Sequence, residues 1–93
     1  MPAISGQKTV TAAGTAEPLG SQAINAALLV KALDTNTGVI VIGCDGAGDV
    51  SLDNGLRLSP GEAVVFEFIG HLASVWIDAA VSSEGAGWLA LNV

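Results

Sequence analysis

The chain has 93 residues, of which 51% are hydrophobic and only 13% charged, and its formal net charge is −6. Its three Lys and Arg residues cannot neutralise a run of phosphates, which excludes binding to nucleic acid and to an anionic membrane surface. The length predicts one domain, which at this size buries only about 60–65% of its unfolded surface. We therefore expect the excess apolar surface to be covered by copies of the chain or by another protein.

No apolar run in the sequence approaches the roughly 18–20 residues that a membrane-spanning helix needs. The N-terminal residues lack the apolar segment of a signal peptide. The single cysteine, Cys44, allows neither an internal disulfide nor a cysteine-based zinc site. These features predict a protein that is made in a cytoplasm.

In chain order, residues 1–7 are expected to form a flexible arm before a domain over residues 8–93. Residues 8–12 alternate between polar and apolar side chains, as a short strand does. Residues 21–33 are ambiguous, because Ser21 is a good helix cap while the apolar side chains recur with period two. The period favours a strand, and a helix is the alternative.

The Asp-Thr-Asn-Thr-Gly segment at residues 34–38 is predicted to reverse the chain between two antiparallel strands. The β-branched run at residues 39–42 suits a strand that is covered on both faces. Pro60 and Gly61 predict a second tight turn, before a strand over residues 63–68. Further strands are expected at residues 72–81 and 88–93, with a turn at 82–87 between them.

Short strands separated by turn signals at roughly 8–12-residue spacing are typical of all-β folds. The sequence predicts a single-domain antiparallel β-sandwich of roughly seven to eight short strands, either a jelly roll or an Ig-like fold.

Few residues are candidates for catalysis or metal binding. Asp45, Asp49 and Asp53 crowd a glycine-rich loop and are weak calcium candidates, but their spacing does not match a calcium-binding loop. Cys44 ends an apolar strand with no cation beside it in sequence, and His71 follows a glycine, so neither is expected to be catalytic. We therefore predict no enzyme activity, no resident metal and no cofactor.

The two tryptophans, Trp76 and Trp88, are the remaining candidates for a binding function. Exposed indoles would suit a sugar-stacking platform. Each tryptophan lies in an apolar strand, however, which favours packing in the core or at a subunit interface.

Four segments carry a resemblance to a known family. They are KTVTAAGT at residues 8–15, KALDTNTGVIVIG at 31–43, GLRLSPGE at 55–62, and WIDA at 76–79 with GAGWLAL at 85–91. In this order the chain resembles the small β-sandwich virion proteins of tailed bacteriophages, among them capsid decoration (cement) proteins. The resemblance covers residues 8–91.

The resemblance implies a homotrimer on the outer capsid surface that binds the major capsid protein at capsomer junctions, after synthesis in the host cytoplasm. Candidate contact residues are Pro2, Ala3 and Ile4 of the arm, the loop at 45–54, and Trp76 and Trp88. The alternatives are another virion subunit (tail, neck or head fibre) and a carbohydrate- or calcium-binding β module.

Overall fold

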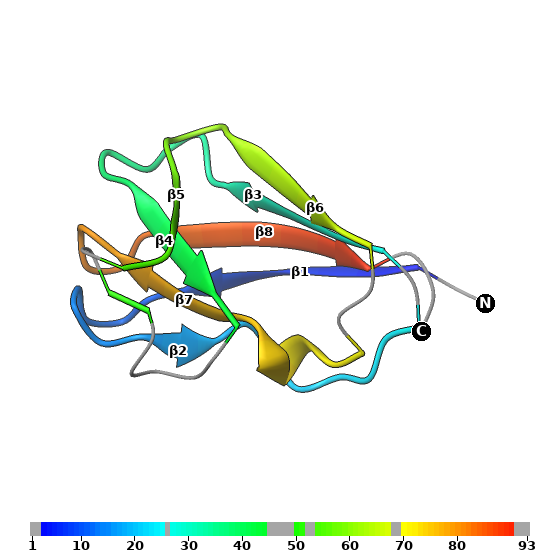
Figure 1. The fold of residues 1–93 in the computed structure, drawn as a ribbon. Coiled ribbons are helices and arrows are strands. Elements are labelled where there is room, and N and C mark those ends of the chain that lie inside the picture. Colours follow the sequence, from blue (N-terminus) through cyan, green and yellow to red (C-terminus); the bar gives the residue numbers. More distant parts are fainter. Residues whose placement is uncertain (1–2, 26, 45–49, 52–53, 68–69, 91–93) are drawn as a thin grey trace.

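A computed structural model describes residues 3–25, 27–44, 50–51, 54–67 and 70–90. Within these residues, eight strands form two antiparallel sheets of four strands each (Figure 1). The strands are β1 (Ile4–Thr9), β2 (Glu17–Pro18), β3 (Leu28–Ala32), β4 (Ile40–Gly43), β5 (Leu56–Leu58), β6 (Ala63–Phe66), β7 (Trp76–Ala79) and β8 (Gly85–Ala90). Sheet 1 has the order β1-β8-β3-β6 and sheet 2 the order β2-β7-β4-β5. The predicted all-β sandwich is confirmed.

The strand pairing identifies the sandwich as a jelly roll. The first strand pairs with the last, β2 with β7, β3 with β6, and β4 with β5. This is the pairing of one long antiparallel hairpin that is rolled up so that successive pairs of strands fall in opposite sheets. Of the two predicted architectures, the structure has the jelly roll and not the Ig-like fold.

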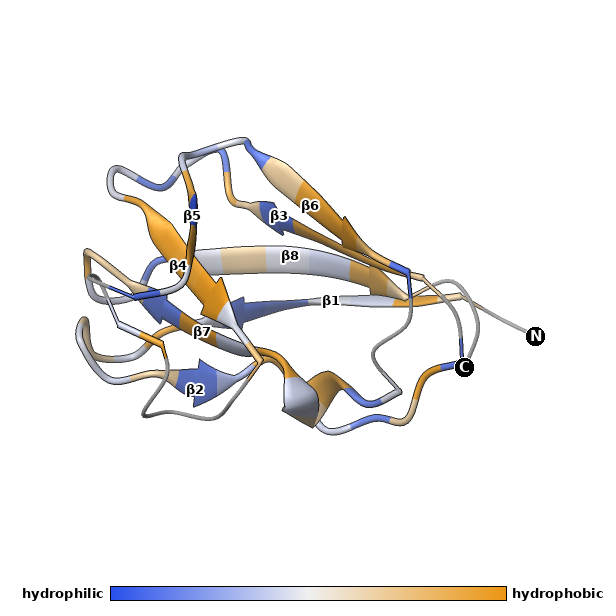
Figure 2. Cartoon of the chain, in the orientation of Figure 1, coloured by the Kyte–Doolittle hydropathy of each residue, from blue (hydrophilic) through white to orange (hydrophobic). Residues whose placement is uncertain are grey.

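The core lies between the two sheets and follows from the alternation of side chains along each strand. In β3, Leu28, Val30 and Ala32 are buried while Lys31 is exposed. From sheet 2, alternating residues such as Ile40 and Ile77 face them. Figure 2 shows that β4 and β6 are hydrophobic along most of their length.

The ambiguous segment at residues 21–33 contains a strand and, among its described residues, no helix. β3 occupies Leu28–Ala32, and Ala23 forms an isolated bridge with His71. The central position of β3 in sheet 1, between β8 and β6, explains why period two prevails over the helix propensity of residues 22–29. The only helix among the described residues is a 3-10 turn over Leu72–Ser74, so none is long and apolar enough to cross a membrane.

The segment at residues 34–38 turns the chain between β3 and β4, but these two strands do not pair with each other. β3 belongs to sheet 1 and β4 to sheet 2, so the segment crosses from one sheet to the other. A turn sequence specifies local backbone geometry and carries no information on whether the flanking strands pair or pack across a core.

The second predicted turn is confirmed. Gly61 has a φ of +85°, and the Glu62 amide donates to the Ser59 carbonyl at 2.9 Å. Proline followed by a glycine at positive φ is the signature of a type II turn. This turn carries the chain from β5 in sheet 2 to β6 in sheet 1.

Part of the segment expected to form the N-terminal arm lies in the first strand. Ile4 to Gln7, expected in an arm over residues 1–7, lie in β1 and pair with β8 from Ala90 to Gly87. Because the half-buried Ile4 packs on the core, this segment is held in the sheet.

The expected strand at residues 72–81 is shorter than predicted. Its first residues form the 3-10 turn, in which the His71 Nδ1 atom accepts a hydrogen bond from the Ala73 amide at 3.0 Å. Residues 85–87, expected in a turn because of two glycines, begin β8 instead. The glycine at position 85 serves a close backbone contact with β1.

Candidate interaction surface

The outer face of sheet 1 carries apolar side chains where a solvated sheet would carry polar ones. Val65 of β6, Leu29 of β3 and Leu89 of β8 lie in one row across neighbouring strands. Val65 is 61% exposed, and both leucines are half-buried. The opposite face of these strands packs on the core, so along this row they carry apolar side chains on both faces, although Lys31 of β3 also points outward. Apolar side chains on both faces are typical of strands that are covered on both sides.

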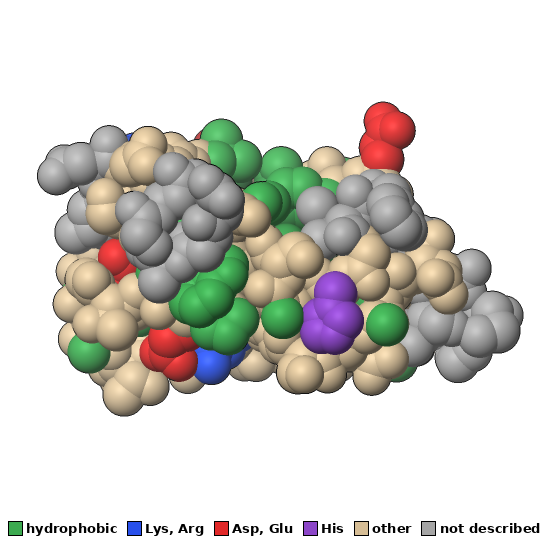
Figure 3. All heavy atoms as spheres, turned by 60° about the horizontal axis from the view of Figure 1, so that its bottom comes forward, with side chains coloured by type: hydrophobic (Ala, Val, Ile, Leu, Met, Phe, Trp, Pro, Cys, Tyr) green, Lys and Arg blue, Asp and Glu red, His purple; other side chains and the backbone are tan. Residues whose placement is uncertain are grey.

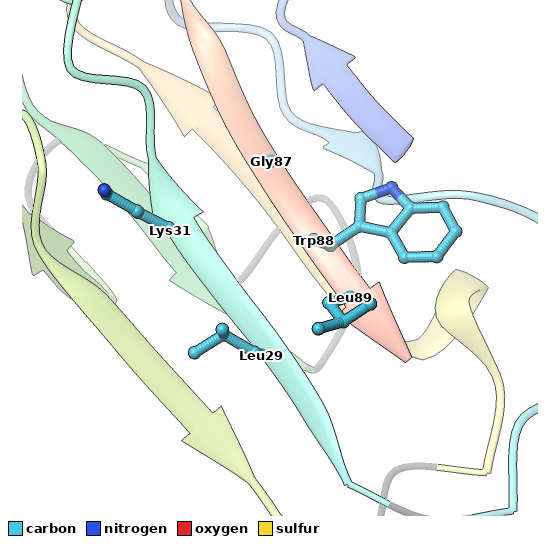
Figure 4. A pocket seen from close by; sticks show the side chains of 5 residues that line it. All are labelled: Leu29, Lys31, Gly87, Trp88 and Leu89. Atoms are coloured by element: carbon cyan, nitrogen blue, oxygen red, sulfur yellow. The ribbon is translucent and has the colours of Figure 1, made fainter. Parts of the chain in front are cut away.

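A hollow lies beside this row. It has a volume of about 220 Å³ and is lined by Leu29, Lys31, Gly87, Trp88 and Leu89. Gly87 contributes no side chain, and an added Cβ there would meet no atom closer than 3.8 Å. Figure 4 shows the side chains of the residues that line the hollow, Leu29 and Leu89 among them. The indole of Trp88 lies away from Leu29.

The centre of the outer face of sheet 2, around Val41 and Asp78, is covered by the chain itself. Val41 and Asp78, which pair across β4 and β7, are both fully buried. A Cβ atom at Gly55 would overlap Val41, so the backbone near β5 lies directly over it, and the Gly14 amide donates to the Asp78 carboxylate at 3.0 Å. The prediction that residues 39–42 are covered on both faces is confirmed for residues 40–42, which are buried, whereas Val39 is half-buried.

Elsewhere among the described residues, Leu56 of β5 and Val81 are also exposed large hydrophobic residues, at 48% and 41% against 61% for Val65. Figure 3 shows the side of β2 and the 3-10 turn, where hydrophobic side chains lie in separate patches between polar, charged and histidine side chains. The outer face of sheet 1 is therefore the candidate functional surface.

The tryptophans do not form one platform. Trp88 pairs with Val30 on the inner face of sheet 1, and its indole lies over Gly6 of β1, where a Cβ atom would approach it to 2.9 Å. Trp76 lies in sheet 2 beside Pro18, with its neighbour Ile77 pointing into the core. Both indoles are half-buried, in different sheets and on different faces.

Of the predicted arm contacts, Ala3 is exposed and Ile4 is half-buried in β1, whereas Pro2 lies outside the described residues. The calcium candidates Asp45, Asp49 and Asp53 also lie outside them. Within the described part of the chain, no group of three or more His, Cys, Asp or Glu side chains is placed to hold a metal ion.

Cys44 and His71, neither of which was expected to be catalytic, both lie in the described part of the chain. Partial burial raises the pKa of the Cys44 thiol, although the residue is exposed overall, so the thiol is kept protonated. His71 uses its Nδ1 atom to cap the 3-10 turn.

A hydrogen-bonded clamp that was not predicted from the sequence joins the turn at residues 34–38 to the start of β8, and its Asn36 bonds are buried. The Asn36 side chain donates to the Gly85 carbonyl at 2.8 Å and accepts from the Gly85 amide at 3.3 Å. The Glu84 carboxylate accepts from the Thr37 amide and hydroxyl at 2.7 and 2.9 Å, and from the Gly38 amide at 3.0 Å. The sequence signal for this clamp was Asn36 inside a predicted turn, where an asparagine is explained by the local turn geometry alone.

The amide hydrogen bonds from Gly38 and Thr37 lower the pKa of Glu84 below its ordinary value of 4.5. A carboxyl with a lowered folded-state pKa stabilises the fold above its unfolded pKa, and this stabilisation is lost as the pH falls through the folded value. We expect Glu84→Gln to lower the melting temperature at neutral pH, with the difference from wild type shrinking below about pH 4.5.

Melting curves followed by circular dichroism across the acidic range would measure this difference. Glu17, whose pKa is lowered by the Thr11 amide and by Lys8, is present in both proteins and largely cancels in the comparison. Glu67→Gln, at an exposed residue after β6, removes the same charge and is the control. A melting-temperature difference for Glu84→Gln that does not change with pH would contradict the assigned role.

Comparisons of the chain with protein-family models, with curated proteins and with solved structures gave no match.

Proposed function

We propose that this chain is a non-enzymatic structural subunit of a tailed-bacteriophage virion, a decoration protein that stabilises the capsid. In this proposal it forms a homotrimer on the outer capsid surface and binds the major capsid protein at capsomer junctions, after synthesis in the host cytoplasm. The observation that carries the proposal is the apolar, uncovered outer face of sheet 1 in a small acidic domain. A surface of this kind on a soluble chain suits assembly into a larger particle.

Two further points support the proposal. The segments that resemble phage virion proteins include the DTNTG turn and the SPGE turn, which cross between the two sheets of the jelly roll. Jelly rolls are frequent among viral capsid proteins, although they also occur in lectins, so this support is at the level of fold alone.

The mechanism would be mass action. A subunit that binds the assembled shell but not its separate parts stabilises the shell, by an amount that grows with its free concentration over its Kd. Trimeric binding at a symmetry axis would raise the apparent affinity through effective concentration, without a new type of contact.

The test is the copy number in purified particles of the phage that encodes this chain. We expect quantitative mass spectrometry to find the chain at a large, fixed ratio to the major capsid protein. A few copies per particle would assign it to the tail, neck or a head fibre instead, and absence from the particle would reject the proposal.

A further inference from the structure

We infer that a second copy of this chain packs on the outer face of sheet 1, with Val65 of one copy seated in the hollow over Gly87 of the next. The proposed function includes self-association of the chain, and this inference assigns the surface for it. The inference rests on the self-association alone and not on the place of the chain in a virion.

The projecting half of the contact is Val65. It lies in β6, at the edge of sheet 1, and is 61% exposed, the largest value among the exposed large hydrophobic residues of the described chain. It points to the same side as Leu29, with which it pairs. A side chain of this type that projects from a sheet gains most when a partner buries it.

The receiving half is the hollow over Gly87, between Leu29 and Leu89. It lies on the same face as Val65, with β3 between them, because β6 and β8 both pair with β3. A symmetric assembly requires that each copy carry both halves of the contact. Here the projecting Val65 and the receiving hollow lie on one face of the same chain. Identical copies can therefore make the same contact with one another in a closed symmetric assembly.

The distribution of charge favours the same occupant. Copies with a net charge of −6 repel one another on average. The described outward positions of β1, β3, β6 and β8 carry no carboxylate, and their one charged residue is Lys31. The Nζ atom of Lys31 lies 3.6 Å from the Oδ1 atom of Asp34, which follows β3. The ammonium group can therefore stay at the rim of the hollow, while the aliphatic stem of Lys31 borders the hollow. The strands of this face therefore bring no carboxylate of one copy against another, and the nearby Glu62 and Glu67 lie beyond the ends of β6.

Packing of the faces is favoured over pairing of the open edges. Glu62 and Glu67 flank β6, and antiparallel pairing of two β6 strands would bring these carboxylates of both copies together. Charges at the ends of an exposed edge strand are a common protection against such pairing.

Sedimentation equilibrium of the purified chain, from micromolar to millimolar concentration, tests the inference with three variants. Val65→Glu removes the projecting side chain and adds a charge. Gly87→Val fills the hollow without charge, at a position where the backbone leaves room for a side chain. Val81→Glu is the matched control, because Val81 is also exposed, at 41%, and lies in the turn before β8.

We expect the wild type and Val81→Glu to form the same oligomer, a dimer or a trimer. Val65→Glu and Gly87→Val should each weaken the association roughly tenfold or more. Circular dichroism spectra and melting curves would verify that all variants fold.

Three results would overturn the inference: a wild type that is monomeric at every concentration, variants that associate as tightly as wild type, or equal weakening by Val81→Glu. The outer face of sheet 1 would then be assigned to contact with a different protein. None of these results bears on the copy number in the particle, so failure here and failure of the proposed function are distinguishable.

Discussion

Gly85→Ala is expected to destabilise the fold strongly. A Cβ atom at this position would overlap the Lys8 carbonyl oxygen and approach the Thr9 Cα atom to 2.7 Å. Both are backbone atoms of the paired strand β1, so no side-chain rotation relieves the overlap and the end of the β1–β8 ladder must separate. We expect a loss of more than about 4 kcal/mol, a large part of the roughly 5–15 kcal/mol that stabilises a typical domain.

Urea unfolding followed by tryptophan fluorescence would measure this loss. Gly87→Ala is the matched control, because it makes the same change in the same strand where the nearest atoms would be 3.8 and 3.9 Å away. At concentrations where the chain is monomeric, the control should change the stability by no more than about 0.5 kcal/mol. Similar losses in the two variants would refute the steric explanation.

Asn36→Ala is expected to cost about 2–3 kcal/mol of stability. The substitution removes two hydrogen bonds between the Asn36 side chain and the backbone of Gly85, in a site where the asparagine is only 7% exposed. The Gly85 carbonyl keeps its bond from the Leu33 amide at 3.2 Å, whereas the Gly85 amide loses the acceptor described here. Loss of a partner by a buried amide is the larger part of the expected cost.

The control for this prediction is the neighbouring Thr35→Ala. Thr35 is exposed and lies in the same turn, so its removal should change the stability by no more than about 0.5 kcal/mol. Urea midpoints of the two variants give the comparison. If Thr35→Ala were as costly as Asn36→Ala, the turn itself, and not the clamp on Gly85, would be the stabilising feature.

The sequence was informative where the signal is local. The alternation within residues 21–33 and the β-branched run at residues 39–42 located β3 and β4, and Pro60 and Gly61 located a type II turn. The sequence was not informative where one residue type serves two purposes. Glycine at 85 indicated a turn, yet its role is to let two backbones approach, which depends on a strand more than 70 residues earlier in the chain.

The candidate surface was only partly predictable. The excess of apolar residues indicated that some face must be covered, and this followed from composition alone. Leu29, Val65 and Leu89 could not be singled out, because an aliphatic residue has the same sequence signature whether it faces a core or the outside of a sheet. Their placement on one face follows from the pairing of β3 with both β6 and β8, which are far apart in the sequence.

The rolled pairing of the strands also dictates when the chain can fold during synthesis. β8 lies inside sheet 1, between β1 and β3, and β7 lies inside sheet 2, between β2 and β4. Until the ribosome has released these late strands, β1 and β2 lack their described pairing partners, and only β4 and β5 can form a pair between adjacent strands. Pairs that close long loops form slowly, so we expect the nascent chain to stay open and dependent on chaperones until β8 emerges.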